Sequence, residues 1–292
     1  MIDNGLLKKY FENKNTGREG AIFKTQELPK RGAVPMEIKI SKSTSGIFYF
    51  KRCRVHRSDD AEILLSQLCA KYFNINTAIY LPATLKSSSN EKVSGVISND
   101  VRCGVTPNIE NTLHAYDYGR VCLPYNKSDM TEYVQSQNAL FSRECIRNIV
   151  KMRLFDVGAL NDDRHSNNFF YQIDADNKAV DIALIDYGFS ANGYCDYNLH
   201  NGSDGCFYYN DFLTDKDDGT EKNRNKMVDN FKHNESMQEY ITPRELVETL
   251  EQVDVKATAR DIYDTIGYKV GEEYVDTIAE SFENLAEEVS RA

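Results

Sequence analysis

The hydrophobic pattern of this chain changes near residue 103, and this change constrains the fold more than any other feature. Before that point, short runs rich in β-branched and aromatic residues predict a small sheet packed against one helix. After it, apolar residues recur every three or four positions, which predicts helices. The predicted strands are 20–23, 36–40, 46–51, 77–81 and 92–97, with a helix at 59–73, a later hairpin at 168–172 and 180–185, and further helices at 137–160, from 242 onward, at 257–266 and at 272–292.

The composition predicts a globular protein and argues against binding to nucleic acid. The chain has 292 residues, of which 41% are hydrophobic, and this is enough to bury a sizeable core. Lys and Arg total 35 against 45 Asp and Glu, which gives a net charge of −10. A phosphate backbone would be repelled by that charge, so we expect no direct nucleic-acid partner.

The cysteines and the apolar runs predict a cytoplasmic protein. The seven cysteines are scattered without a C-x-x-C pair, so they encode neither a disulfide framework nor a cysteine zinc site. No run approaches the roughly 18 consecutive apolar residues of a membrane span. The first residues lack the charged and apolar regions of a secretory signal.

Two acidic motifs bracket the predicted hairpin. The first is Asn161-Asp-Asp-Arg-His-Ser-Asn-Asn168, and the second is Ile185-Asp-Tyr-Gly-Phe189. A hairpin returns the chain to its starting edge, so Asn168 and Asp186 are expected to lie close together. Asp and Asn clusters are usually turn formers, but these residues stand in order on both sides of a strand pair.

These residue types match the requirements of phosphoryl transfer. That reaction needs one carboxylate near the acceptor hydroxyl, and a second carboxylate with an amide oxygen to hold Mg²⁺ on the nucleotide phosphates. Asp163 precedes Asn168 by five positions, which is the interval between the catalytic Asp and the metal-binding Asn of protein kinases. Asp186-Tyr-Gly then takes the place of Asp-Phe-Gly. We therefore predict ATP and Mg²⁺ as cofactors, with Asp163, Asn168 and Asp186 as catalytic residues and the last two as metal ligands.

The motif Asp163-Arg-His-x-x-Asn168 followed by Ile185-Asp-Tyr-Gly188 resembles the catalytic core shared by the HipA-like kinases and the phosphatidylinositol 3/4-kinase-like fold. The strand ending at Lys51, the helix at 61–75 and the segment 95–100 resemble further parts of short bacterial HipA-like proteins. The resemblance implies a two-lobed, protein-kinase-like α+β fold: a small β-rich N-lobe at 1–103, a hinge near 99–104 and a mostly helical C-lobe at 104–292. It also implies a Ser or Thr of a protein as the acceptor, autophosphorylation included.

Residues of the N-terminal part are candidates for nucleotide contacts. Lys51 ends an aromatic strand and resembles the phosphate-contacting lysine, although a solvated lysine at a strand end is common. Glu62 is its candidate ion-pair partner, and it also has the spacing from Asp59 that a helix-capping box would need. The turn Ser41-Lys-Ser-Thr-Ser-Gly46 replaces a glycine-rich loop, so Ser43, Thr44, Ser45 and Gly46 are candidate phosphate contacts or an ordinary hairpin turn.

Two other functions remain open at this point. A lipid or small-molecule hydroxyl would use the same site, and a pseudokinase would bind nucleotide or a partner without turnover. The negative charge gives anionic membranes no general attraction and favours a protein substrate. HipA-like toxins are longer than this chain and carry an extra N-terminal subdomain, so the resemblance alone does not establish a toxin role or an antitoxin partner.

Overall fold

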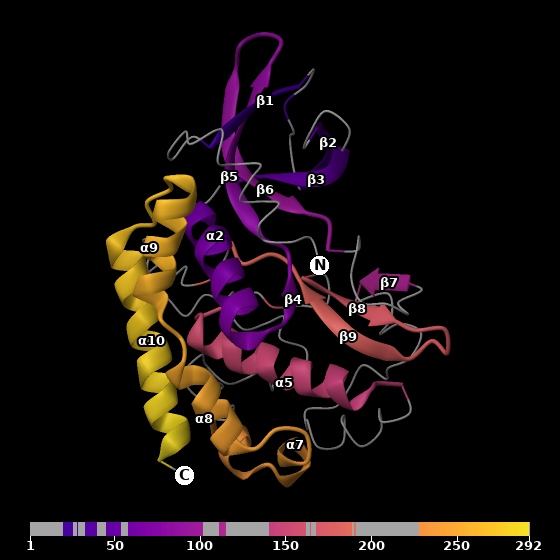
Figure 1. Cartoon of the computed structure of the whole chain (residues 1–292), viewed down its shortest axis with the longest axis vertical. Coiled ribbons are helices and arrows are strands. Elements are labelled where there is room, and N and C mark those ends of the chain that lie inside the picture. Colours follow the sequence, from indigo (N-terminus) through magenta and orange to yellow (C-terminus); the bar gives the residue numbers. More distant parts are fainter. Residues whose placement is uncertain are drawn as a thin grey trace, which may run out of the picture.

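The structure is a computed structural model, and it describes residues 20–25, 28, 33–39, 45–53, 58–101, 111–114, 140–161, 164, 168–188, 190 and 228–291. These residues form two β-sheets with helices packed against them (Figure 1). A mixed α/β architecture is therefore confirmed. Among the described helices, none is long and apolar enough to cross a membrane.

The larger sheet is built from the first part of the chain and has the strand order β1-β5-β6-β3-β2. Its strands are β1 (Ala21–Thr25), β2 (Ala33–Lys39), β3 (Ser45–Arg52), β5 (Tyr80–Ser87) and β6 (Lys92–Asn99). Neighbouring strands are antiparallel except β1 and β5, which are parallel. The strands predicted over residues 20–97 all correspond to strands of the structure, although the run 77–81 divides between β5 and a short strand of the second sheet.

Helix α2 (Ser58–Leu68) follows β3 and continues into a π-helical turn, η2 (Cys69–Phe73). The helix is buried on nearly all sides, because it packs against β5 and β6 on one side and against α9 (Val255–Ile266) on the other. Its buried Asp60 is paired, since it accepts hydrogen bonds from the Tyr268 hydroxyl at 2.6 Å and from the Gly271 amide at 3.2 Å. The predicted packing of this helix across the sheet is confirmed.

The smaller sheet has the order β4-β9-β8-β7 and carries the predicted hairpin. Its strands are β4 (Asn76–Thr77), β7 (Asn111–His114), β8 (Phe169–Ile173) and β9 (Ala179–Leu184). Asp174 closes the turn between β8 and β9, because its carboxylate accepts from the backbone N–H groups of Asp176 and Lys178. Helix α5 (Arg143–Gly158) packs on β9, and Ser142 caps its first turn.

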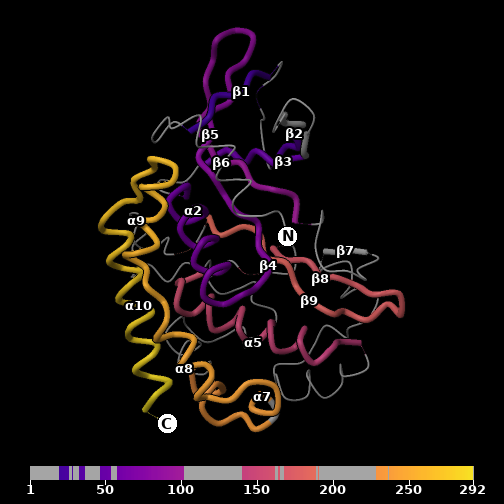
Figure 2. The backbone as a smooth tube through the Cα atoms, viewed as in Figure 1, coloured from indigo at the N-terminus to yellow at the C-terminus, as the bar shows by residue number. Residues whose placement is uncertain are grey.

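The last third of the described chain is helical, as predicted. It contains α7 (Glu235–Gln238), α8 (Pro243–Glu251), α9 and α10 (Glu272–Ser290). Thr242 and Glu245 form a capping box at the start of α8, with Pro243 in its first turn. Helices α8, α9 and α10 lie together along one side of the molecule, next to α2 and α5, and α7 lies at its lower end (Figures 1 and 2).

The two parts predicted on either side of residue 103 are interlocked. Strand β4, from the first part, pairs with β9 from the second, and η2 packs against α5 and α8. The buried apolar residues of both parts belong to one core cluster. The division at residue 103 and the two-lobed layout therefore stay predictions, and residues 102–110 lie outside the described part of the chain.

Candidate functional site

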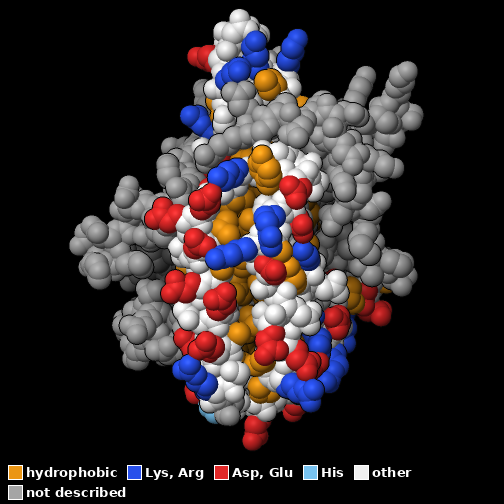
Figure 3. Space-filling model, turned by 60° about the vertical axis from the view of Figure 1, so that its left-hand side comes forward, with side chains coloured by type: hydrophobic (Ala, Val, Ile, Leu, Met, Phe, Trp, Pro, Cys, Tyr) orange, Lys and Arg blue, Asp and Glu red, His pale blue; other side chains and the backbone are white. Residues whose placement is uncertain are grey.

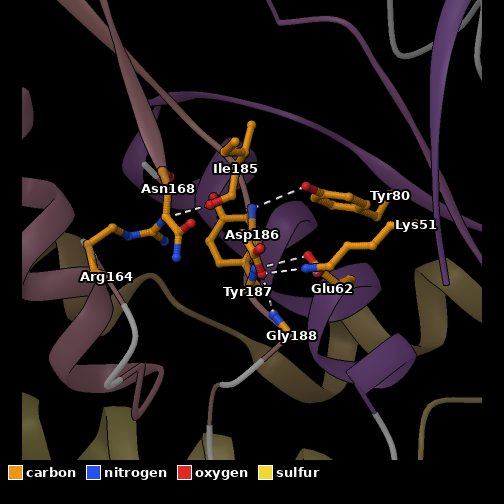
Figure 4. A network of polar contacts seen from close by, with 9 residues as sticks. All are labelled: Lys51, Glu62, Tyr80, Arg164, Asn168, Ile185, Asp186, Tyr187 and Gly188. Carbon is orange, nitrogen blue, oxygen red and sulfur yellow. Dashed lines mark hydrogen bonds and ion pairs between the residues drawn. The ribbon is translucent and has the colours of Figure 1, made fainter. Parts of the chain in front are cut away.

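Lys51, Glu62 and Asp186 meet where β3, α2 and the segment after β9 come together. The Lys51 ammonium lies 2.5 Å from Glu62 Oε1 and 2.5 Å from Asp186 Oδ1. Figure 4 shows the three side chains pointing toward one another. The side chains of Lys51 and Asp186 are 24% and 29% exposed, whereas that of Glu62 is fully buried. A ligand arriving from solvent can thus reach the lysine and the aspartate, while the glutamate supports them from inside.

The sheet register explains why Lys51 faces this site. Lys51 stands opposite Val96 of β6, and Tyr80 of β5 stands opposite Ser98 of the same strand. Side chains alternate along a strand, so Lys51 and Tyr80 project from the same face of the sheet. The segment after β9 passes under this face, and the Asp186 amide donates to the Tyr80 hydroxyl at 3.1 Å.

Glu62 uses both carboxylate oxygens. Oε1 pairs with Lys51, and Oε2 accepts a hydrogen bond from the backbone N–H of Tyr187 at 2.9 Å. The helix already includes Ser58 and Asp59, so the capping box considered for Asp59 and Glu62 is not formed. Glu62 therefore joins the helix, the strand lysine and the second acidic motif in one contact.

The ionisation of the three groups follows from one cation facing two carboxylates. Burial raises the pKa of Glu62 to about 7, against the opposing effect of Lys51. Burial also opposes ionisation of Lys51 and Asp186, but the attraction of Glu62 and Asp186 for Lys51 outweighs it and raises the pKa of Lys51, and the attraction of Lys51 lowers the pKa of Asp186. Asp186 is thus the ionised carboxylate, and Glu62 is the group that takes up a proton first.

This arrangement predicts how stability depends on pH. A carboxyl whose pKa is higher in the folded state than in the unfolded one adds stability below its unfolded pKa, and that stability is lost as pH rises through the folded pKa. For Glu62 the window runs from its ordinary value of 4.5 to about 7. The free energy of unfolding of the wild type, minus that of Glu62→Gln, should fall across this window when measured by urea titration. A difference that stays constant, or that rises with pH, would contradict the assignment.

The β8–β9 hairpin brings the two acidic motifs together. Phe169 pairs with Leu184, and the Ile185 amide donates to the Asn168 carbonyl at 3.1 Å. Asn168 is buried, and it lies beside Asp186 in Figure 4. The residues thus come together although 18 positions separate them in the sequence.

Arg164 ties the first motif to the second. It is fully buried and forms an ion pair with Asp156 of α5 at 3.2 Å. Arg164 Nη1 donates hydrogen bonds to the carbonyl oxygens of Asn168 at 2.7 Å and Ile185 at 2.6 Å. The guanidinium also lies over the ring of Tyr187, 5.0 Å from its centre. A planar group with five donors suits this task, because it can bond several acceptors in fixed directions.

Tyr187 and Gly188 fit the second motif closely to its surroundings. The Tyr187 hydroxyl shares a hydrogen bond with Thr77 Oγ1 at 2.6 Å, so the polar end of this buried ring has a partner. A Cβ on Gly188 would lie 3.0 Å from Glu62 Oε1 and 3.4 Å from Lys51 Nζ. A side chain at position 188 would therefore crowd the ion pair.

Several predicted site residues lie outside the described part of the chain. These are Asp163, Ser43 and Thr44, together with His165 of the first motif. Ser45 and Gly46 begin β3, but their side chains are not described. The structure brings together Lys51, Glu62, Asn168 and Asp186, and the reaction roles of all the predicted residues stay predictions.

The oxygen donors at the site suit Mg²⁺. Within the described residues, no group of three or more His, Cys, Asp or Glu side chains could hold a metal ion. Magnesium usually needs only one or two protein carboxylates, because substrate phosphates and water complete its shell. The ionised Asp186 and the amide of Asn168 fit that pattern.

Comparisons with known proteins give structural neighbours only. No family model and no curated protein matches the sequence. The Helicobacter pylori proinflammatory kinase CtkA is similar at 10% identity, over 93% of this chain and 96% of that one, with a TM-score of 0.44. A chain from the Shewanella oneidensis MR-1 complex of HipA, HipB and operator DNA is similar at 13% identity, over 91% and 65%, with a TM-score of 0.39.

A third neighbour is the N-terminal 618-residue fragment of LepB from Legionella pneumophila. It shares 11% identity over 87% of this chain and 46% of that fragment, with a TM-score of 0.35. All three TM-scores are below 0.5. The function proposed below therefore rests on the geometry of the site.

Proposed function

We propose that this protein is an ATP-dependent kinase that transfers the γ-phosphoryl group to a hydroxyl. The observation that carries the proposal is the contact of one lysine, Lys51, with both Glu62 of the following helix and Asp186 of the second motif. Protein kinases need a strand lysine paired with a helix glutamate, and a metal-binding aspartate beside them. The same three groups meet here from the same kinds of element.

A purely structural role explains these contacts less well. Placing a fully buried and a partly buried carboxylate against a single lysine carries a desolvation cost that apolar residues of similar volume would avoid. The shifted pKa values of Glu62, Lys51 and Asp186 arise from that cluster. Perturbed ionisable groups that remain open to solvent are typical of functional sites.

Each residue has a distinct task in the proposed reaction. Lys51 binds phosphate oxygens of ATP, and Glu62 holds the lysine in place. Asn168 and Asp186 hold Mg²⁺, which when bound neutralises charge on the phosphates. Asp163 orients the acceptor hydroxyl and takes its proton onto a carboxylate oxygen as the oxygen–phosphorus bond forms and the bond to ADP breaks.

A Ser or Thr of a protein is the acceptor that we favour. Residues 228–291 contain six Lys and Arg against 16 Asp and Glu, so their net charge of 6 − 16 = −10 equals that of the whole chain. Figure 3 shows acidic side chains spread over the face on which these helices lie. An anionic lipid surface would be repelled by this face, which argues against a phosphoinositide substrate.

The direct test is incubation of the full chain with Mg²⁺ and γ-labelled ATP, first without added substrate and then with added proteins, lipids or small alcohols, followed by mass spectrometry. We expect label on Ser or Thr residues of the protein. Label that enters only added lipids or small alcohols would change the acceptor class, and nucleotide binding with no transfer would refute kinase activity.

A pair of lysine variants tests the part played by the ion pair. Lys51→Met should reduce labelling about 10- to 100-fold, because several charge-assisted bonds to phosphate and carboxylate are lost. Lys71→Met is the matched control, since Lys71 makes an exposed pair with Asp261 at 3.0 Å and lies over the ring of Tyr72, away from the site. Equal labelling by the two variants would remove Lys51 from the site.

A further inference from the structure

The peptide bond between Ile185 and Asp186 is held from both ends. Arg164 donates to its carbonyl oxygen at 2.6 Å, and its N–H donates to the Tyr80 hydroxyl at 3.1 Å. Arg164 comes from the loop after α5, and Tyr80 is the first residue of β5. The plane of this peptide is therefore fixed by side chains from two distant parts of the sequence, as Figure 4 shows.

This peptide sets the direction of Asp186. Asp186 has a φ of +59°, in the left-handed region, which residues other than glycine rarely adopt. A backbone in this region persists only where its surroundings hold it. Rotation of the 185–186 peptide would turn the Asp186 carboxylate away from Lys51 and Asn168, so the groups that bond this peptide determine where the carboxylate points.

Tyr80 is itself firmly placed. Its side chain is buried, its backbone N–H donates to Ser66 Oγ of α2 at 3.3 Å, and its ring meets the ring of Tyr187 edge-on. The hydroxyl therefore cannot follow Asp186 if the backbone rotates. It acts as a fixed acceptor at the point that Asp186 N–H must reach.

We propose that Tyr80 is a positioning residue whose hydroxyl holds Asp186 in the conformation that binds the metal ion. The proposal rests on the proposed function, in which Asp186 is a metal ligand, and it adds a residue outside both acidic motifs. Tyr80 acts through the Asp186 backbone and touches no reacting atom. Without the Tyr80 hydroxyl, the Asp186 N–H has no acceptor in the metal-binding conformation, and that conformation alone is destabilised. The affinity for the cation should therefore fall while the fold persists.

The test measures Mn²⁺ binding by electron paramagnetic resonance in the full chain, with saturating non-hydrolysable ATP analogue. Tyr80→Phe keeps the ring and removes only the hydroxyl, and it should weaken Mn²⁺ binding about tenfold, as expected when one buried hydrogen bond is lost. Tyr72→Phe is the matched control. The Tyr72 hydroxyl also forms a hydrogen bond with the backbone, donating to the Asp254 carbonyl oxygen at a distance of 3.3 Å, and this bond lies outside the site. The control should bind Mn²⁺ like the wild type.

Kinetics and hydrogen exchange separate positioning from general destabilisation. In Tyr80→Phe the Mg²⁺ concentration for half-maximal activity should rise about tenfold, while kcat at saturating Mg²⁺ recovers to near the wild-type value. In the absence of metal, amide exchange in a peptide covering 180–188 should be faster in Tyr80→Phe than in the wild type. Unchanged Mn²⁺ affinity, or affinity lowered equally in Tyr72→Phe, would overturn the inference.

Asp186→Ala separates this inference from the proposed function. If Asp186→Ala loses Mn²⁺ binding and Tyr80→Phe does not, the metal site stands and Tyr80 has no part in it. If Asp186→Ala binds Mn²⁺ like the wild type, the metal site is wrong and the inference about Tyr80 is wrong with it.

Discussion

Replacement of Asp186 with alanine is expected to abolish Mg²⁺-dependent phosphoryl transfer. Asp186 is the only carboxylate that both contacts Lys51 and remains open to solvent among the described residues of the site. Its lowered pKa keeps it ionised, because the attraction of Lys51 outweighs the effect of burial. Without it, Asn168 alone would have to hold the cation, and a single neutral amide is a poor site for Mg²⁺.

The fold should survive this change. Removal of Asp186 leaves Lys51 and Glu62 as a balanced pair of one positive and one negative charge. The melting temperature should therefore stay within a few degrees of the wild type, since no buried charge loses its only partner. Asp176→Ala is the matched control, because Asp176 is exposed in the turn of the same hairpin and should keep full activity. Transfer by Asp186→Ala at the rate of this control would remove Asp186 from the reaction.

The elements of this fold could be predicted because their patterns are local. Helix α8 begins at Pro243 behind Thr242, where the sequence places a cap and a proline. The strands of the β8–β9 hairpin flank a polar turn, and their pairing follows directly from the short connection. Helix α5 begins at Arg143 behind the cap Ser142, so the predicted start at residue 137 is wrong: residues 140–142 are not helical, and Phe141 forms a β-bridge with Ala179.

The arrangement of the strands could not be predicted in the same way. Strand β1 pairs in parallel with β5, which lies more than 50 positions later in the chain, and β4 joins the second sheet. Such pairings depend on long-range packing, and neither leaves a signal in a single sequence. The π-helical turn η2 is another example, because the apolar spacing of 59–73 predicts one continuous helix.

The candidate site was predictable where its chemistry lies inside a motif. Asn168 and Asp186 stand out by residue type, order and spacing, and Lys51 by its place after an aromatic strand. Glu62, which pairs with Lys51, could also be predicted, but the residues that hold Asn168 and Asp186 in place could not. Arg164 lies within the first motif, yet its partner Asp156 is one acidic residue among many in a helix, and Tyr80 carries no signal at all, since an aromatic residue at a strand start is ordinary.

Asp163→Asn is the variant that best separates binding from chemistry. Asp163 itself lies outside the described residues, but the nearest described residues on either side of it, Asn161 and Arg164, both bond to Asp156. The Asn161 amide donates to Asp156 Oδ1 at 2.8 Å, and Arg164 forms its ion pair with the same carboxylate. Because these anchors do not involve Asp163, exchanging its carboxylate for an amide should remove a proton acceptor and leave the loop in place.

Loss of a general base typically slows a reaction about 10²- to 10⁴-fold with little effect on ground-state binding. Asp163→Asn should therefore bind Mg-ATP near normally by calorimetry and transfer phosphate that much more slowly. Asn168→Ala should differ, because its amide oxygen is assigned to the cation, so metal-dependent nucleotide binding should weaken along with the rate. Two results would contradict this assignment: failure of Asp163→Asn to bind Mg-ATP, or full activity in that variant. Either would mean that Asp163 and Asn168, five residues apart, are not the base and the metal ligand that the kinase mechanism requires.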